Sequence, residues 1–487
     1  MNRICRLGIY AYVGLVVLAF TGLPAGATHD PGVQHSQNLM LTGNSPRPAP
    51  FTQSDLAFKG RYAYAGNYNG FRIVDISDSQ NPFQVANVNC NGLQGDVSVY
   101  GDLLFVSVDR PQTSPDCTGQ NTFSDPNRTP YPTDAGWEGI RIFDVGGDPA
   151  SVGPEDLVAA AKTRCGSHTN TLVPDESDPN LVHIYVSSYP LGASNLTSGC
   201  QPPHGIISVV HVPVNNPAGY TVTRHALDPD TLPRTGTNVV GCHDVSVFLA
   251  LNLAAGSCMG EGQFWDISDR SDPDLSNPVH VRNKNVEFWH NASFTWDGKV
   301  AAFGDEAGGG VEARCTSANP ATEGAVWFYN VLRPSGRDDQ VRRTSLSSFK
   351  IPRPQTADEN CTAHNFNFMT RNGSDYLVSA WYQGGTSVVD VTNRQSPTEI
   401  AYWDPAPLAP AQTGLPSAQH FDPGSDDHDH SGDIVLGGQW STYWYNGTIY
   451  ANDLTRGLDV FALSGMAKAQ PRRLSYMNSQ TQEALIP

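Results

Sequence analysis

The segment Gly70–Pro82, GFRIVDISDSQNP, decides the fold, because the chain repeats its pattern. It contains a glycine, an apolar strand, an aspartate and a polar turn that ends in proline. Close copies begin at Gly139 (GIRIFDVGGDP), Gly262 (GQFWDISDRSDP) and Gly385 (GTSVVDVTNRQSP), and more degenerate copies begin at Gly205, Gly324 and Gly457. The copies lie about 55–75 residues apart, a period that is typical of propeller blades with insertions.

A hairpin precedes the repeated strand in several copies. Its turns are Lys59-Gly60, Gly101-Asp102 and Asp297-Gly298, and the last is a strong two-residue hairpin signal. A fourth strand often follows the proline turn. We therefore predict an all-β, seven-bladed β-propeller with four antiparallel strands per blade. A β-sandwich or two separate β domains are the alternatives.

The copies RIVDIS and SVVDVT resemble the LVIVD-repeat family of exported or cell-surface propellers. The resemblance runs from about Phe51 to Leu463, which is most of the chain. It implies a propeller fold but no settled activity. Many members of that family carry a C-terminal surface anchor. This chain ends in MNSQTQEALIP, without an apolar tail, so we expect a freely secreted form.

The chain divides into four parts. Residues 1–27 read as a signal peptide, with Arg3 and Arg6 before an apolar run and cleavage near Ala27. An uncleaved anchor helix is the alternative. Residues 28–50 form an N-terminal segment, 51–463 the propeller, and 464–487 a C-terminal tail. Either the N-terminal segment or the tail supplies the strand that closes the ring. No second apolar run of membrane length follows, so we expect a secreted or periplasmic protein without a transmembrane segment.

Eight cysteines remain after the signal peptide, and an even number in an exported chain indicates disulfides. We expect sequential pairs, namely Cys90–Cys117, Cys165–Cys200, Cys242–Cys258 and Cys315–Cys361. The formal net charge of −18 argues against a nucleic-acid partner. We expect a monomer whose small-molecule or surface ligand the sequence does not identify.

Four consecutive units place a histidine at the same point of their first strand. These are His168, His243, His290 and His364. Because the first strand of every blade lines the central channel, the four side chains should meet at one level. Neutral imidazole is a common ligand of iron, copper and zinc. The arrangement resembles, in geometry alone, the four-histidine iron centre of carotenoid-cleaving propeller oxygenases.

The other units place small or neutral groups at this point, so a bound metal would be open on one side. We expect supporting residues to orient the histidines from a second layer. They are Asp244, Asp305, Asn291 and Asn365. Hairpin pairing sets Asp305 beside His290. Glu306 and Tyr382 are the catalytic candidates.

These residues favour a metal-dependent oxidoreductase that uses iron, copper or zinc. A non-enzymatic binding or scaffold propeller is the main alternative, and a metal-dependent hydrolase with Glu306 as its base is the third. A water-filled channel whose histidines bind nothing also remains open.

Overall fold

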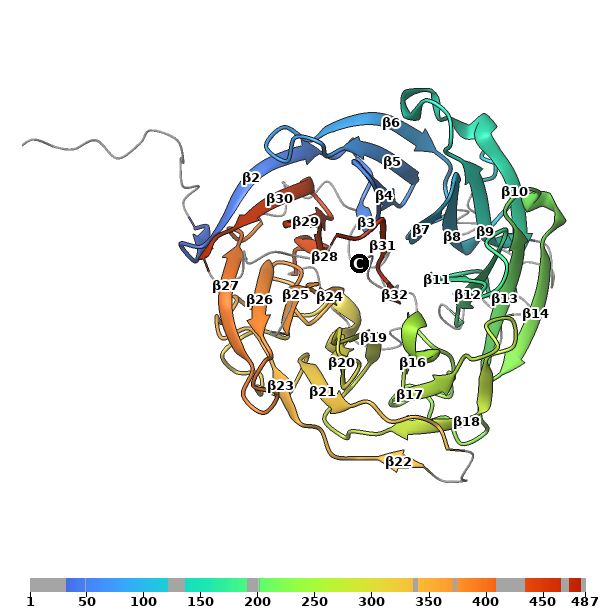
Figure 1. Ribbon diagram of the computed structural model, residues 1–487. Helices are drawn as coiled ribbons and strands as arrows, with labels where there is room; N and C mark the ends of the chain where they lie inside the picture. Colours follow the sequence, from blue (N-terminus) through green and yellow to red (C-terminus); the bar gives the residue numbers. More distant parts are fainter. Residues whose placement is uncertain are drawn as a thin grey trace, which may run out of the picture.

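The computed structural model describes residues 32–48, 50–120, 136–190, 200, 202–335, 340–370, 375–408, 434–465 and 473–482. Their regular structure is β-strand with a few short 3₁₀ turns. The strands form sheets arranged around a central axis, as in a propeller (Figure 1). Within this described part, no helix has the length and apolar character needed to cross a membrane. The signal-peptide prediction lies outside the described residues.

Five sheets stand as independent blades, and four of these have four strands. The first is β7 (Val97–Tyr100), β8 (Leu103–Gln112), β9 (Trp137–Asp144) and β10 (Leu157–Lys162). The second is β11 (Thr169–Pro174), β12 (Leu181–Ser187), β13 (Ile206–Pro213) and β14 (Thr221–Ala226). The third is β19 (Trp289–Phe294), β20 (Val300–Asp305), β21 (Val326–Asn330) and β23 (Ser347–Phe349). The fourth is β28 (Gln439–Tyr445), β29 (Thr448–Asp453), β30 (Gly457–Leu463) and β2 (Leu39–Pro46).

The fifth blade has five strands. They are β24 (Phe366–Phe368), β25 (Tyr376–Ala380), β26 (Thr386–Asp390), β27 (Thr398–Asp404) and β1 (Gln34–His35). The N-terminal strands therefore pair at the outer edges of two blades, since β1 pairs with β27 and β2 pairs with β30, both antiparallel.

The remaining strands form one continuous sheet of 11. One arm is β3 (Gln53–Lys59), β4 (Tyr62–Asn67), β5 (Gly70–Asp75) and β6 (Phe83–Asn89). The other is β15 (Asp244–Phe248), β16 (Leu253–Cys258), β17 (Glu261–Asp266), β18 (Asp274–Val281) and β22 (Val341–Arg342). The C-terminal hairpin of β31 (Tyr476–Asn478) and β32 (Thr481–Gln482) joins the two arms.

The prediction of seven separate four-stranded blades is therefore wrong. The hydrogen bonds define five blades and one fused sheet. The physical cause is the C-terminal hairpin, which lies near the centre of the ring (Figure 1). Ala57 of β3 faces Asn478 in antiparallel register, and Val247 of β15 faces Thr481 in parallel register. The short strands β31 and β32 thus pair with the inner edges of β3 and β15, which would otherwise be free.

Large side chains fill the space between neighbouring sheets. Trp265 packs with residues of β13 and β15, and Trp381 packs with residues of β21 and β25. Both are fully buried, and each indole N–H donates a hydrogen bond, to Gln263 and Ser379 respectively. Truncation of such a side chain to alanine typically costs about 3–5 kcal/mol. These contacts hold the blades, and hence their channel-facing ends, in fixed positions.

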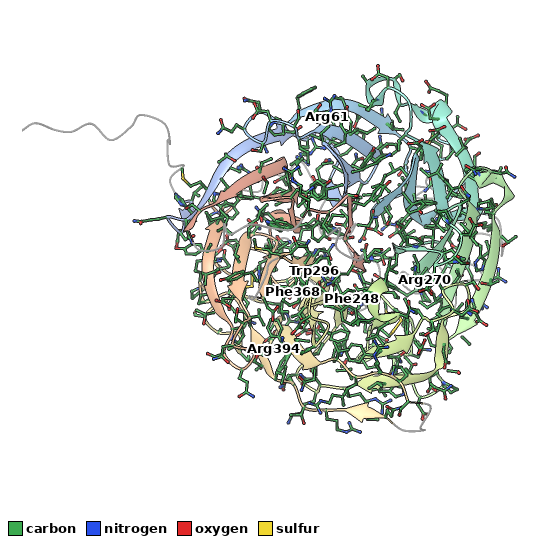
Figure 2. The ribbon with its side chains drawn as sticks, in the orientation of Figure 1. Arg61, Phe248, Arg270, Trp296, Phe368 and Arg394 are labelled. Carbon is green, nitrogen blue, oxygen red and sulfur yellow. A yellow bond between two sulfur atoms is a disulfide. The ribbon has the colours of Figure 1, made fainter. Side chains whose placement is uncertain are left out.

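A second set of aromatic residues lies near the centre of the ring in the view of Figure 2. The ring centroids of Phe248 and Trp296 are 6.1 Å apart, and the Trp296 indole N–H donates to the carbonyl of Phe368 at 3.0 Å. The residues of the C-terminal hairpin line a cavity together with Trp296 and Phe368. The hairpin therefore lies across one end of the channel.

Candidate metal centre

The structure brings the four channel histidines together in one row. His168 immediately precedes β11, His243 immediately precedes β15, His290 lies in β19, and His364 lies two residues before β24. All four are buried. The distances between successive ring centroids are 4.3 Å, 3.9 Å and 4.3 Å along the row. Four strands that are far apart in the sequence thus present adjacent imidazoles.

Burial keeps the central imidazoles neutral. It holds the pKa of His243 well below its ordinary value, and the neighbouring His290 adds to the effect. Burial lowers the pKa of His290 in the same way, with His364 as the next cause. The pKa of His364 falls to about 3, again mainly through burial. Neutral imidazole is the form that binds a metal.

Each of three histidines has its Nδ1 atom held by an oxygen. Asp109 Oδ2 lies 3.0 Å from Nδ1 of His168, and Asp244 Oδ1 lies 3.0 Å from Nδ1 of His243. The backbone carbonyl of Trp440 accepts from Nδ1 of His364. Such contacts fix the ring orientation. The Nε2 atoms of His168 and His243 lie 2.8 Å apart, within hydrogen-bond distance of each other.

His290 has a different environment, because neither of its ring nitrogens has a hydrogen-bond partner among the described residues. The Nε2 atom of His364 is also without one. A buried polar atom without a partner costs free energy, and most such atoms in proteins are satisfied. These buried, unpartnered nitrogens are therefore candidate metal ligands.

Glu306 joins the histidines from the residue after β20. Its Oε2 lies 3.6 Å from His290 Nε2, and its Oε1 lies 3.5 Å from His364 Nε2. One ligand atom from each of His243, His290 and Glu306 lies within 4.8 Å of the other two. The sequence marked Glu306 as a catalytic candidate. The structure places it among the candidate ligands.

Tyr382 holds the carboxylate of Glu306. The Tyr382 hydroxyl donates to Glu306 Oε1 at 2.5 Å, and its ring centroid is 4.6 Å from that of His364. Burial, followed by the charge of Glu306, raises the pKa of Tyr382 well above its ordinary value, so the phenol remains a donor. A Cβ atom on Gly310, at φ +73°, would lie 2.2 Å from this hydroxyl. Only glycine leaves room for the contact.

Of the predicted supporting residues, Asp244 has a hydrogen bond to a channel histidine. Asp305 does not contact His290, because a β-bulge between Trp289 and Ala292 places Asp305 opposite Trp289. Its carboxylate accepts instead from the backbone N–H groups of Glu287, Phe288 and Gly324. The Oδ1 atoms of both Asn291 and Asn365 lack a hydrogen-bond partner among the described residues.

The candidate centre borders a cavity of about 590 Å³. Its lining includes all four histidines, Glu306 and Tyr382, and residues that sequence reasoning did not assign, namely Tyr189, Arg234, Phe288 and Trp440. The Arg234 guanidinium lies 4.7 Å from the ring centroid of Phe288. These four come mostly from loops outside the repeat, so no periodic signal marks them.

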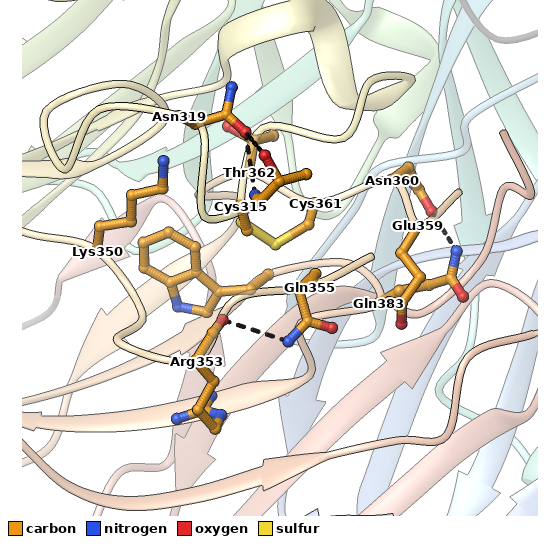
Figure 3. The surroundings of a disulfide bond; sticks show 12 residues. Cys315, Asn319, Lys350, Arg353, Gln355, Glu359, Asn360, Cys361, Thr362 and Gln383 are labelled. Carbon is orange, nitrogen blue, oxygen red and sulfur yellow. Dashed lines mark hydrogen bonds between the residues drawn. A yellow bond between two sulfur atoms is a disulfide. The ribbon is translucent and has the colours of Figure 1, made fainter. Parts of the chain in front are cut away.

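All four disulfides of the expected pairing are present, namely Cys90–Cys117, Cys165–Cys200, Cys242–Cys258 and Cys315–Cys361. Such bonds are typical of proteins in oxidising compartments outside the cytosol. Cys165, Cys242 and Cys361 lie within three residues of a channel histidine. Figure 3 shows the last of the disulfides, with Asn360 and Gln383 hydrogen-bonded nearby at 3.1 Å. Three disulfides thus fix the backbone beside the candidate centre.

These features define the class of protein: an all-β propeller with a buried row of histidines at a channel cavity. The model of the LVIVD repeat matches residues 52–90, which confirms the resemblance seen in the sequence. No curated protein matches the chain.

Several solved structures align with most of the chain at low identity. The β-propeller domain of Cps50 (Swd1) from Myceliophteria thermophila is 9% identical, covers 88% of this chain and 100% of that one, and has a TM-score of 0.45. The structure of the WD40 repeats of RRP9 is 7% identical, covers 89% of this chain and 100% of that one, and has a TM-score of 0.44. The computationally designed Ika8 protein is 9% identical, covers 87% of this chain and 99% of that one, and has a TM-score of 0.38. Such scores carry no argument about function.

Proposed function

We propose that this protein is an exported, monomeric propeller that binds one transition-metal ion in its channel and uses it in a redox reaction on a small molecule. The proposed ligands are His243, His290 and Glu306. The observation that carries the proposal is the gathering of these three ligand groups within 4.8 Å, one of them a buried histidine with no hydrogen-bond partner among the described residues.

The ligand types favour iron. Two histidines and one carboxylate, with the other positions open, are the ligand set of non-haem Fe(II) oxygenases. Zinc hydrolases also use two histidines and a glutamate, so a metal-dependent hydrolase is the second candidate. Glu306 is then a ligand and not the base that the sequence suggested. Copper remains compatible with the histidines.

The protein residues would position the metal and the substrate. Asp109 and Asp244 hold two imidazoles, and Tyr382 holds one oxygen of Glu306, so the other oxygen faces His290. A bound metal supplies Lewis acidity and open coordination positions. Aromatic side chains form part of the wall of the adjoining cavity, together with a few polar groups, as in small-molecule sites. His168 and His364 flank the three ligands.

Metal analysis of the untagged exported protein tests this proposal. We expect about one equivalent of iron, copper or zinc per chain after purification without chelators. Iron favours the oxidoreductase and zinc favours the hydrolase. A protein that holds no transition metal, and takes none up under anaerobic conditions, would support the non-enzymatic binding propeller and overturn the proposal.

A further inference from the structure

A second cavity lies on the other side of the histidine row. It is smaller than the first, and His243, His290 and His364 line both cavities. Its remaining wall is different, because carboxylates and neutral oxygen donors predominate. Asp55, Asp96 and Asp244 all line this inner cavity.

The carboxylates of the inner cavity lack basic partners. Asp55 lies in β3 and Asp96 lies just before β7, and both are buried. Within the described part of the chain, no lysine or arginine forms an ion pair with either. Burial, followed by the charge of Asp55, raises the pKa of Asp96 well above its ordinary value. Buried carboxylates need either a proton or a cation.

Several oxygens of the same wall have no partner. Asp96 Oδ1, Ser54 Oγ and Asn365 Oδ1 lack a hydrogen bond among the described residues. All three side chains are at least 95% buried and line the inner cavity. Ser54 Oγ and Asn365 Oδ1 are neutral oxygens, so for these two atoms the observation is independent of the carboxylate charge.

From these contacts we infer that the inner cavity binds a calcium ion. The proposed direct ligands are Asp55 and Asp96, with Ser54 and Asn365 as neutral donors. Oxygen-only sets suit hard cations, and calcium accepts irregular arrangements of six to eight oxygens, including water. The carboxyl oxygens of Asp55, Asp96 and Asp244 do not all approach within 4.8 Å of one another, so Asp244 remains the partner of His243.

The proposed ion would also stabilise the C-terminal hairpin. Ser479 Oγ donates to Asp55 Oδ2 at 2.9 Å, and the Gln480 side-chain amide lies 3.5 Å from the same oxygen. The hydroxyl of Tyr443 donates to the other oxygen at 2.7 Å. A cation on Asp55 would therefore stabilise the position of the hairpin that joins the two arms of the fused sheet.

Thermal unfolding with and without calcium tests the inference, on protein first treated with EGTA. We expect Tm to rise by about 3 °C at a calcium concentration of 100 times Kd. Isothermal titration should give one site. The double variant Asp55→Asn/Asp96→Asn should lose both responses, and without calcium it should melt no lower than the wild type, since it no longer buries unpaired charge. Asp175→Asn, in the turn between β11 and β12, is the matched control and should keep both.

The variant His290→Ala separates this inference from the proposed function, since it should keep the calcium response even if transition-metal binding is lost. A wild type that shows neither heat of calcium binding nor a change in Tm would overturn the inference and identify Asp55 and Asp96 as a pair that shares a proton. A calcium response that persists in the double variant would also overturn it.

Discussion

Two groups of neighbouring histidines in this molecule differ in one decisive respect. The outer group is His183, His211 and His225 on β12, β13 and β14, and every ring nitrogen in it has a protein partner. In the channel group, His290 has none for either nitrogen, and His364 has none for Nε2, among the described residues. Proximity of imidazoles alone is therefore a poor sign of a metal site. Buried nitrogens without partners are a better one.

Removal of one histidine from each group gives the largest expected contrast. His290→Ala should reduce metal affinity by more than the 10–100-fold that loss of an orienting contact costs, because it removes a ligand. His211→Ala should leave the affinity unchanged. Metal content after equilibrium dialysis, with circular dichroism to confirm folding, measures both. Equal affinities in the two variants would remove the distinction between the groups.

The disulfides offer a second contrast. Cys242→Ser/Cys258→Ser frees the backbone next to His243, whereas Cys90→Ser/Cys117→Ser breaks a bond that is not adjacent to a channel histidine. Each pair of substitutions should lower the free energy of unfolding by about 3 kcal/mol, because the unfolded chain gains conformational entropy when the disulfide is absent. Only the first should also weaken metal binding, by about tenfold. Denaturant unfolding and metal titration separate the effects, and equal metal affinities would contradict the account.

A smaller effect is expected from Tyr382→Phe. This change removes the hydroxyl that donates to Glu306 Oε1 and keeps the ring against His364. We expect about tenfold weaker metal binding with little change in Tm, because the carboxylate loses its orientation while packing is preserved. Tyr185→Phe, in β12, is the control, since the Tyr185 hydroxyl donates to the backbone carbonyl of Arg270 away from the channel. An unchanged affinity in Tyr382→Phe would remove this tyrosine from the site.

The stability of the metal-free protein should also depend on pH. The folded pKa of His364 is about 3, below the ordinary 6.5 of the unfolded chain. Below about pH 6.5 the unfolded state takes up a proton that the folded state does not, so stability falls as pH falls toward 3. The slope is about 1.4 kcal/mol per pH unit for each such histidine. His364→Gln should make the slope of unfolding free energy against pH shallower, and an unchanged slope would contradict this.

The features that follow from the repeat could be predicted from the sequence. Glycine, strand, aspartate and proline in register gave the all-β propeller, and the same register aligned His168, His243, His290 and His364. Local pairing of cysteines was also correct, since each disulfide closes a loop of at most 46 residues.

Features that break the repeat were not predictable in this way. The bulge between Trp289 and Ala292 shifts the register by one residue, which turns Asp305 away from His290 and onto backbone N–H groups. The fusion of two sheets depends on only five residues of β31 and β32, too few to give a pattern. Asp55 and Asp96 each follow the position that aligns with the channel histidines. Two isolated aspartates do not indicate a site in the sequence, and only the fold shows that both are buried.

Anomalous X-ray scattering from a crystal of the purified protein tests the central claim most directly. Data collected on both sides of the absorption edge of the metal found by elemental analysis locate that metal without assumptions. We expect one peak, at about 2.0–2.2 Å from a nitrogen of His243, a nitrogen of His290 and an oxygen of Glu306. A peak at the outer group of His183 and His211, or a fully loaded protein with no peak in the channel, would contradict the account.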